Sequence, residues 1–297
     1  MIEPFVDIEW VAQHRDEVVL ADCRWYTDDR SGRDAYDAGH IPGAVFVDLD
    51  TALTRHAGPA AAGRHPLATP EDFAAAMAAL GIGDDDTVIA YDDAGGVIAA
   101  RLAWMLRASG HEAALLDGGL QAWEGELETE PSVRVPATFT ARPWPAERLV
   151  TIDDAAAASR AIAARPDDGA AAGDPAPNDD DAPAAQLIDA RPADRFAGAP
   201  DDLDPRAGHI PGARSVSCRE NLGADGRLLP VAELRERFGV ENASEVISYC
   251  GSGVTACHNL LAMEQAGLGR GRLFPGSWSQ WSRDPARPAE TGSAGAP

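Results

Sequence analysis

The chain contains no lysine. All 25 of its basic residues are arginine, and 48 acidic residues leave a formal net charge of −23. A surface this acidic repels nucleic-acid phosphates and anionic lipid headgroups. We therefore expect neither nucleic acid nor a membrane as a partner. Because salt screens the repulsion between surface charges, so dense an acidic charge favours a protein from a salt-rich cytoplasm, that is, from a halophile. A GC-rich genome would explain the arginine and alanine bias alone.

Cysteine is scarce and long apolar runs are missing. The four cysteines (Cys23, Cys218, Cys250 and Cys257) are too few and too scattered for a disulfide framework. No apolar run approaches membrane-spanning length, and the N-terminus lacks the charged-then-apolar pattern of a signal peptide. We therefore expect a reducing, cytoplasmic location. Cys250 and Cys257 are seven residues apart and no Cys-x-x-Cys pair exists, so a zinc site is not expected.

The sequence repeats itself. AGHIPGA at residues 38–44 recurs at residues 207–213. An apolar run that ends on an acid and an arginine precedes each copy, at 19–24 and 187–191. Another apolar run ending in tyrosine follows each copy. The two halves are therefore homologous units that differ mainly in loop length.

Each unit alternates short apolar runs with helical patterns such as those at 70–80 and 98–109. This alternation predicts α/β domains, each with a mainly parallel sheet and helices on both faces. We place the domains at 1–145 and 146–290. Residues 166–184 contain only Pro, Asp, Gly, Ala and Asn, which predicts a flexible acidic insertion.

Cys250 lies at the end of an apolar run and begins the loop CGSGVT, which a helical pattern follows. Backbone N–H groups of such a loop turn toward the thiol, and the helix adds its positive end. Both effects lower a thiol pKa and stabilise negative charge on sulfur, although an ordinary buried cysteine can also end a strand. A cysteine phosphatase would clamp phosphate with an arginine about six residues later. Ala256 stands there, and the loop has no cation.

The repeated GHIPGA and the CGSGVT loop of the second half together resemble two-domain rhodanese-family sulfurtransferases. The resemblance implies two tandem rhodanese-like domains, of which only the C-terminal one is catalytic, and a persulfide intermediate on Cys250. Members that act on 3-mercaptopyruvate carry CGSGVT, whereas thiosulfate-using members carry an arginine and a lysine after the cysteine.

The first unit carries Asp92 at the position that matches Cys250. A carboxylate cannot accept sulfane sulfur, and the neighbouring Asp93 would repel an anionic donor. We therefore interpret the first domain as a scaffold that walls one side of a cleft between the domains.

The resemblance assigns further residues. Arg195 matches the arginine that holds the substrate carboxylate, a task that suits the planar guanidinium, although it could also be a solvated surface residue. His65 matches a histidine that faces the cleft from the first domain, and Asp50 matches the acid that orients it. Asp189 and Arg191 match a structural ion pair.

Within the loop we expect Gly251, Gly253 and Val254 to bind the substrate. Ser252 and Thr255 can polarise it or relay a proton. Thr255 could instead be only the cap of the following helix.

One departure from the family pattern concerns the second substrate-binding arginine. Acids occupy its expected place in residues 198–205, and Arg206 follows them. Either Arg206 substitutes for it, or the substrate carboxylate is held less tightly.

We predict a sulfurtransferase that moves sulfur from 3-mercaptopyruvate, through a Cys250 persulfide, to a thiol, cyanide or a thioredoxin-like protein. It needs no metal or organic cofactor. A thiosulfate sulfurtransferase is the first alternative, and a non-catalytic persulfide carrier is the second.

Overall fold

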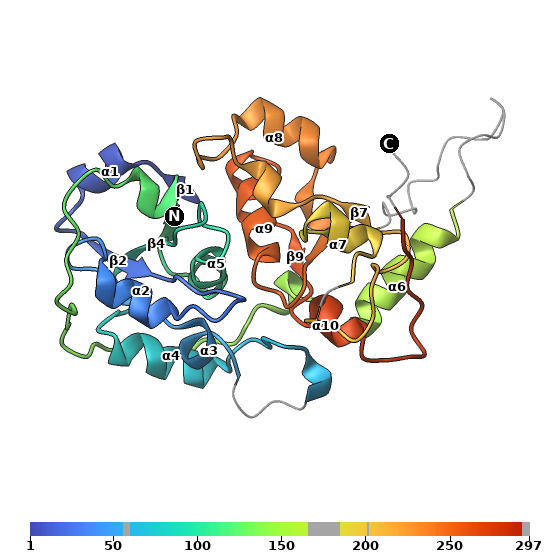
Figure 1. Cartoon of the computed structure of the whole chain (residues 1–297), viewed down its shortest axis with the longest axis horizontal. Coiled ribbons are helices and arrows are strands. Elements are labelled where there is room, and N and C mark those ends of the chain that lie inside the picture. The colour runs from blue at the N-terminus through green and yellow to red at the C-terminus, as the bar shows by residue number, and fades with distance from the viewer. Residues whose placement is uncertain (56–59, 166–184, 201, 293–297) are drawn as a thin grey trace.

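The computed structural model describes residues 1–55, 60–165, 185–200 and 202–292. They form two α/β units that lie side by side (Figure 1). The insertion predicted at 166–184 lies outside the described residues. Each unit has its own parallel sheet.

The first unit is built on a five-stranded sheet with the order β1-β5-β4-β2-β3, in which every strand pair is parallel. Its strands are β1 (Phe5–Val6), β2 (Val18–Asp22), β3 (Val45–Phe46), β4 (Thr87–Tyr91) and β5 (Ala113–Leu116). Its helices are α1 (Ile8–Gln13), α2 (Gly32–Ala38), α3 (Leu49–Ala52), α4 (Pro70–Ala79) and α5 (Ala100–Ala108).

The second unit repeats this topology, with an isolated parallel bridge between Leu149 and Leu273 in the place of β1. Its four-stranded parallel sheet has the order β7-β6-β8-β9. The strands are β6 (Gln186–Asp189), β7 (Arg214–Ser215), β8 (Val246–Tyr249) and β9 (Arg272–Leu273). The helices are α6 (Ile152–Ala163), α7 (Ala193–Ala197), α8 (Val231–Phe238), α9 (Ala256–Gln265) and α10 (Ser277–Trp281). The predicted α/β fold with parallel sheets is thus confirmed.

Local sequence explains where these elements begin. The central strands β2 and β8 are buried along their whole length, as expected of parallel strands covered on both faces. Thr69 caps α4 just before Pro70, and Thr151 forms a capping box with Asp154 at the start of α6.

The repeated GHIPGA motif is structural in both units. The hydroxyl of Tyr91, at the end of β4, accepts a hydrogen bond from the Ile41 N–H at 3.1 Å. The hydroxyl of Tyr249, at the end of β8, likewise accepts a hydrogen bond from the Ile210 N–H at 3.2 Å. Each motif thus anchors the strand end that carries Asp92 or Cys250.

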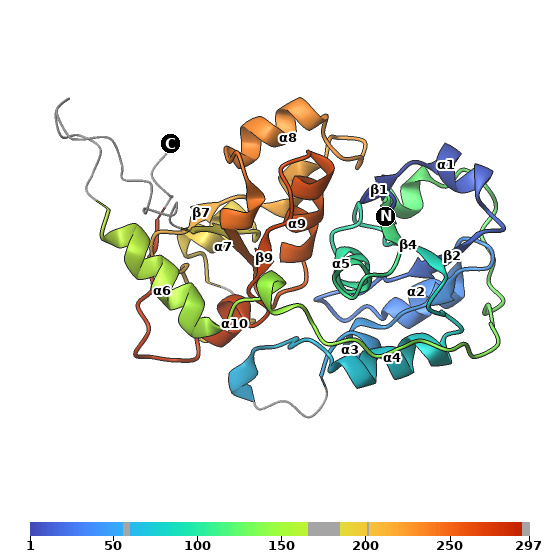
Figure 2. The ribbon, with the colours of Figure 1, turned by 180° about the vertical axis from the view of Figure 1, so that it is seen from behind.

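The two units meet through α5 and α9, which pack against each other (Figures 1 and 2). Arg107 of α5 donates to the Glu264 carboxylate of α9 at 2.7 Å, and both side chains are largely buried. This packing brings the carboxyl ends of β4 and β8 toward one interface. No helix in the described part of the chain is long and apolar enough to cross a membrane.

Candidate active site

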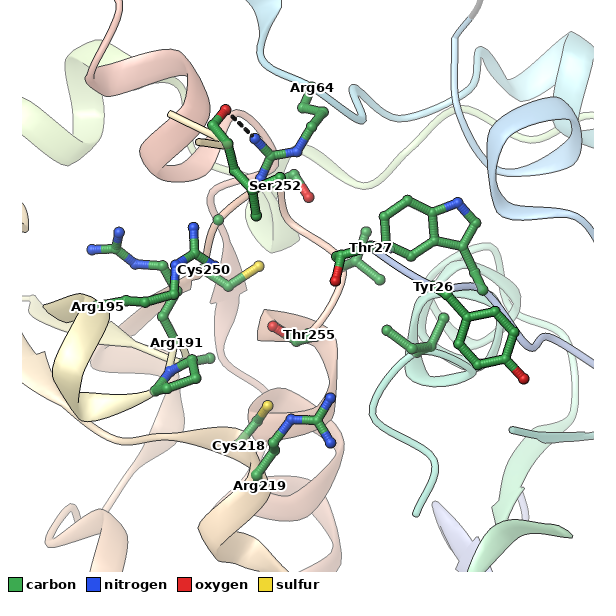
Figure 3. A pocket seen from close by; sticks show the side chains of 17 residues that line it. Tyr26, Thr27, Arg64, Arg191, Arg195, Cys218, Arg219, Cys250, Ser252 and Thr255 are labelled. Carbon is green, nitrogen blue, oxygen red and sulfur yellow. Dashed lines mark hydrogen bonds between the residues drawn. The ribbon is translucent and has the colours of Figure 1, made fainter. Parts of the chain in front are cut away.

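A cavity of about 480 Å³ lies between the two units, at the carboxyl ends of β6 and β8. The loop after β8 lines it with Cys250, Gly251, Ser252, Val254 and Thr255. Other lining residues come from both units, among them Trp25, Tyr26, Arg64 and Ile98 of the first and Arg191, Arg195, Cys218 and Arg219 of the second. In Figure 3 the Cys250 sulfur points into this space, between Arg64 and Arg219.

Cys250 is held on several sides and is only 2% exposed. Its sulfur accepts a hydrogen bond from the Gly253 N–H at 3.1 Å, and its own N–H donates to the Ser277 hydroxyl at 3.1 Å. Gly253 has a φ of +77°, and a Cβ there would lie 2.4 Å from the Pro275 carbonyl oxygen, so only glycine fits. The loop therefore turns an N–H toward the sulfur, where it can stabilise negative charge.

The matching loop of the first unit directs its backbone N–H groups at a carboxylate in the same way. Asp92 is fully buried after β4, and each of its carboxylate oxygens accepts two backbone N–H groups. Burial raises the pKa of this carboxyl, and the four N–H donors oppose that shift. The donors belong to Ala94, Gly96, Ile98 and Ala99, at 2.7–2.9 Å.

Ser252, His65 and Asp50 form a chain across the domain boundary. The Ser252 Oγ lies 2.8 Å from His65 Nδ1, and His65 Nε2 lies 3.4 Å from an Asp50 oxygen. Trp25 Nε1 donates to the other Asp50 oxygen at 3.0 Å. Burial lowers the pKa of His65, and Asp50 partly opposes that shift. A neutral His65 can therefore exchange a proton with Ser252 at neutral pH.

Arg101 of α5 lies next to the Ser252–His65–Asp50 chain and is fully buried. Its guanidinium donates to the Gly253 carbonyl at 2.8 Å and to the His65 carbonyl at 3.0 Å. Burial lowers the pKa of Arg101, and the thiols of Cys257 and Cys250 counteract this. Sequence reasoning missed this residue, although an arginine within the apolar run 98–106 was a usable signal.

The other cysteines are buried and poor nucleophiles. Burial raises the pKa of Cys218 and of Cys257 to about 12, and it raises the pKa of Cys23 well above its usual value. Cys257 donates its S–H to the Gly253 carbonyl at 3.4 Å. Cys218 lines the cavity, but its thiol stays protonated near neutral pH.

Comparison with known proteins decides the family. The model of the rhodanese-like domain matches residues 7–126 and 176–284. The chain belongs to the rhodanese family. The predicted resemblance to two-domain sulfurtransferases of this family is thereby confirmed.

Relatives of this chain cover nearly its whole length. It is 40% identical to a probable 3-mercaptopyruvate sulfurtransferase of Pseudomonas aeruginosa, over 93% of each chain. It is 36% identical to a putative thiosulfate sulfurtransferase of Mycobacterium tuberculosis, over 97% of this chain and 96% of the other. Among solved structures, the 3-mercaptopyruvate sulfurtransferase SseA of Escherichia coli has a TM-score of 0.75 at 36% identity, covering 94% of this chain and 100% of that one.

The structure places the remaining predicted residues as follows. Arg195 and Val254 line the cavity, whereas Gly253 lies behind the sulfur. Thr255 also lines it, at the N-cap position of α9, and its side chain makes no capping hydrogen bond to that helix. Asp189 and Arg191 form a buried ion pair at 2.6 Å.

The structure does not place Arg206 at the cavity, which contradicts its predicted role as a second substrate arginine. Its guanidinium donates to four backbone carbonyls between residues 281 and 287, at 2.8–3.1 Å. Sequence distance alone did not reveal that the side chain points toward the C-terminal segment. Arg64 reaches the cavity instead, from the first domain.

We predict that Arg206→Gln lowers the free energy of unfolding by about 1.5–3 kcal/mol, because it removes charged donors from several carbonyls. The KM for sulfur donors should stay near its wild-type value. Denaturant unfolding and steady-state kinetics test this together. A large rise in KM at unchanged stability would return Arg206 to the substrate site.

We predict that Asp92→Asn destabilises the first domain by about 2–4 kcal/mol, because an amide NH₂ leaves two buried N–H donors without an acceptor. Urea unfolding measures the loss, with Asp37→Asn on the exposed face of α2 as the matched control. Equal stability of the two variants would show that the N–H groups around Asp92 do not need an anion.

Proposed function

We propose that this rhodanese moves sulfane sulfur from 3-mercaptopyruvate to a thiol, cyanide or a reduced thioredoxin-like protein through a persulfide on Cys250. The observation that carries the proposal is the Ser252–His65–Asp50 chain beside Cys250. When the C–S bond of 3-mercaptopyruvate breaks, the leaving group is an enolate, which must take up a proton on carbon. The Ser252–His65–Asp50 chain can supply that proton. The names of the relatives from Pseudomonas aeruginosa and Escherichia coli support the same donor.

In the first half-reaction, the Cys250 thiol gives its proton through Ser252 to His65, and Asp50 stabilises the resulting imidazolium. The thiolate attacks the donor sulfur. The new S–S bond forms as the C–S bond breaks, and its electron pair leaves on carbon as pyruvate enolate. His65 returns the proton through Ser252 to that carbon. Thiol and donor thus become persulfide and pyruvate without net proton change.

In the second half-reaction, the acceptor attacks the outer sulfur of the persulfide. The S–S bond breaks, and its electron pair returns to Cys250 as a thiolate. The Gly253 N–H and the start of α9 stabilise this charge. The acceptor carries away the sulfur, and the enzyme is ready for another donor.

Thiosulfate is the second candidate donor, and the name of the Mycobacterium tuberculosis relative favours it. Its leaving group is sulfite, which needs no proton, so the Ser252–His65 pair would have no task. A cation placed at Gly251 would also meet Arg64 and Arg195, because a Cβ there lies 3.1 Å from Arg64 and 3.7 Å from Arg195. The site therefore suits 3-mercaptopyruvate better. A non-catalytic carrier would need neither the cavity nor the proton chain.

The first domain serves as a scaffold in this proposal, since Asp92 fills the place of the nucleophile. We further propose that the enzyme works in a reducing, salt-rich cytoplasm. Its four cysteines are all free and buried, and its net charge is −23. Activity that rises with salt would support this environment.

We predict that kcat/KM is higher for 3-mercaptopyruvate than for thiosulfate, and that Cys250→Ser abolishes turnover of both. Cys23→Ser and Cys257→Ser should keep most of the activity, because neither thiol faces the donor. Pyruvate and thiocyanate release, measured at high salt with cyanide as acceptor, tests this. A higher kcat/KM for thiosulfate would reject the proposed donor, and an active Cys250→Ser would reject the nucleophile.

We predict an acid limb in the pH profile of kcat/KM for 3-mercaptopyruvate, because protonated His65 cannot accept the thiol proton. Asp50 raises the pKa of His65, so Asp50→Asn should lower that pKa further and move the limb to lower pH. Initial rates from acidic to neutral pH measure the shift. A limb that moves upward, or stays in place, would separate Asp50 from the titrating group.

A further inference from the structure

We propose that a second pocket, beside the catalytic cavity, binds the sulfur acceptor, and that the acceptor it takes is a small thiol with both an ammonium and a carboxylate group. Asp93 of the first domain binds the ammonium group, and Arg219 of the second domain binds the carboxylate. The inference rests on the proposed function. It adds a site and a chemical class for one acceptor, which the proposed function leaves open.

The second pocket has a volume of about 240 Å³ and adjoins the catalytic cavity. Arg30, Asp93 and Ala94 line only the second pocket. Five further residues line both spaces: Trp25, Tyr26, Thr27, Ile98 and Arg219. Because these side chains are shared, a molecule held in the second pocket lies next to the cavity that contains the Cys250 sulfur.

The position of the second pocket follows from the duplication of the fold. The catalytic cavity lies at the carboxyl ends of β6 and β8, whereas the second pocket lies at the carboxyl ends of β2 and β4, the equivalent strands of the first unit. Asp92 fills the place of the nucleophile there, and the two residues that follow it, Asp93 and Ala94, line the pocket. The first domain has thus lost the nucleophile but kept a pocket at the same strand ends.

Two opposite charges face the second pocket without pairing with each other. The Asp93 carboxylate accepts a hydrogen bond from the Tyr26 hydroxyl at 2.7 Å, and its other oxygen accepts none from the described residues. Arg219 is exposed, and within the described part of the chain its guanidinium makes no hydrogen bond or ion pair. The neighbouring Glu220 pairs with Arg237 instead. An acid and a base held apart in one pocket are complementary to a zwitterion.

The other charged side chain of the second pocket already has partners. Arg30 pairs with Asp28 at 3.0 Å and lies over the Tyr26 ring at 3.8 Å. Burial and the neighbouring Asp93 raise the pKa of Tyr26 to about 12, so its hydroxyl remains a hydrogen-bond donor at neutral pH. Asp93 and Arg219 are therefore the two charged groups that a ligand can bind.

The chemistry of transfer favours an acceptor that approaches from the first domain. A thiolate attacks a persulfide along the axis of the S–S bond, from the side opposite the leaving sulfur. The Cys250 sulfur points into the cavity, and Thr27 and Tyr26 lie across the cavity from it (Figure 3). The acceptor thiolate bonds to the outer sulfur as the S–S bond to Cys250 breaks, and the electron pair of that bond returns to Cys250. The product is the persulfide of the acceptor.

Four thiols test the charge pattern. L-cysteine carries both charged groups, 3-mercaptopropionate only the carboxylate, cysteamine only the ammonium group, and 2-mercaptoethanol neither. Each serves as acceptor for wild type, Arg219→Gln and Asp93→Asn, with pyruvate release from 3-mercaptopyruvate as the signal. Arg33→Gln and Asp37→Asn, which alter an exposed ion pair of α2, are the matched controls. Because kcat/KM is compared between variants for the same acceptor, differences in intrinsic thiol reactivity cancel.

We expect Arg219→Gln to lower kcat/KM roughly fivefold for L-cysteine and for 3-mercaptopropionate, and to raise it for cysteamine. Asp93→Asn should have the opposite pattern: a loss for L-cysteine and cysteamine, and a gain for 3-mercaptopropionate, because a repelling charge is removed. The change for 2-mercaptoethanol should be the smallest. The change in kcat/KM for 3-mercaptopyruvate should also be smaller, because in a double-displacement reaction that quantity depends only on the first half-reaction.

The outcomes separate this proposal from the proposed function. If wild type releases no pyruvate from 3-mercaptopyruvate with cyanide as acceptor, the proposed function fails. If wild type is active and the two variants match their controls, or lose equally with all four thiols, only the acceptor site is overturned. A larger loss for 3-mercaptopyruvate than for any acceptor would also overturn it, in favour of a role in donor binding. A loss seen only with a reduced thioredoxin-like protein would show that the second pocket serves a protein and not a small thiol.

Discussion

The buried guanidinium of Arg101 joins the two halves of the active site. A buried cation is unfavourable unless its donors find acceptors, and here two acceptors are the carbonyls of Gly253 and His65. Gly253 belongs to the loop around Cys250, and His65 belongs to the other domain. Because one side chain binds both, the packing of α5 against α9 fixes where His65 lies relative to Ser252. The Ser252–His65–Asp50 chain therefore depends on how the two domains pack against each other.

The duplicated fold uses one anion-binding geometry for two purposes. In the first domain the carboxylate of Asp92 satisfies four backbone N–H groups permanently, so that loop is a stable part of the scaffold. In the second domain a thiol takes this place, with the Gly253 N–H directed at it. Charge that appears on the Cys250 sulfur during transfer then meets a donor that is already in position.

The fold and the place of Cys250 at the end of β8 could be predicted because their signals are local: a repeat, an apolar run that ends in cysteine, and a small-residue loop. The family resemblance also located His65 and Asp50, which the structure brings to Ser252. Arg206 was misassigned because a position in a loop does not reveal which way a long side chain points. Arg64 and Arg101 were missed because their roles depend on contacts between domains, which no local pattern records.

The central claim is that sulfur passes through Cys250. The most direct measurement treats the intact protein with one equivalent of 3-mercaptopyruvate, without an acceptor, and maps the added sulfur by peptide mass spectrometry. The account predicts one extra sulfur atom on the peptide that contains Cys250, in proportion to the pyruvate released. Extra sulfur on Cys218 or Cys257 instead, or pyruvate release with no sulfur bound to the protein, would contradict it.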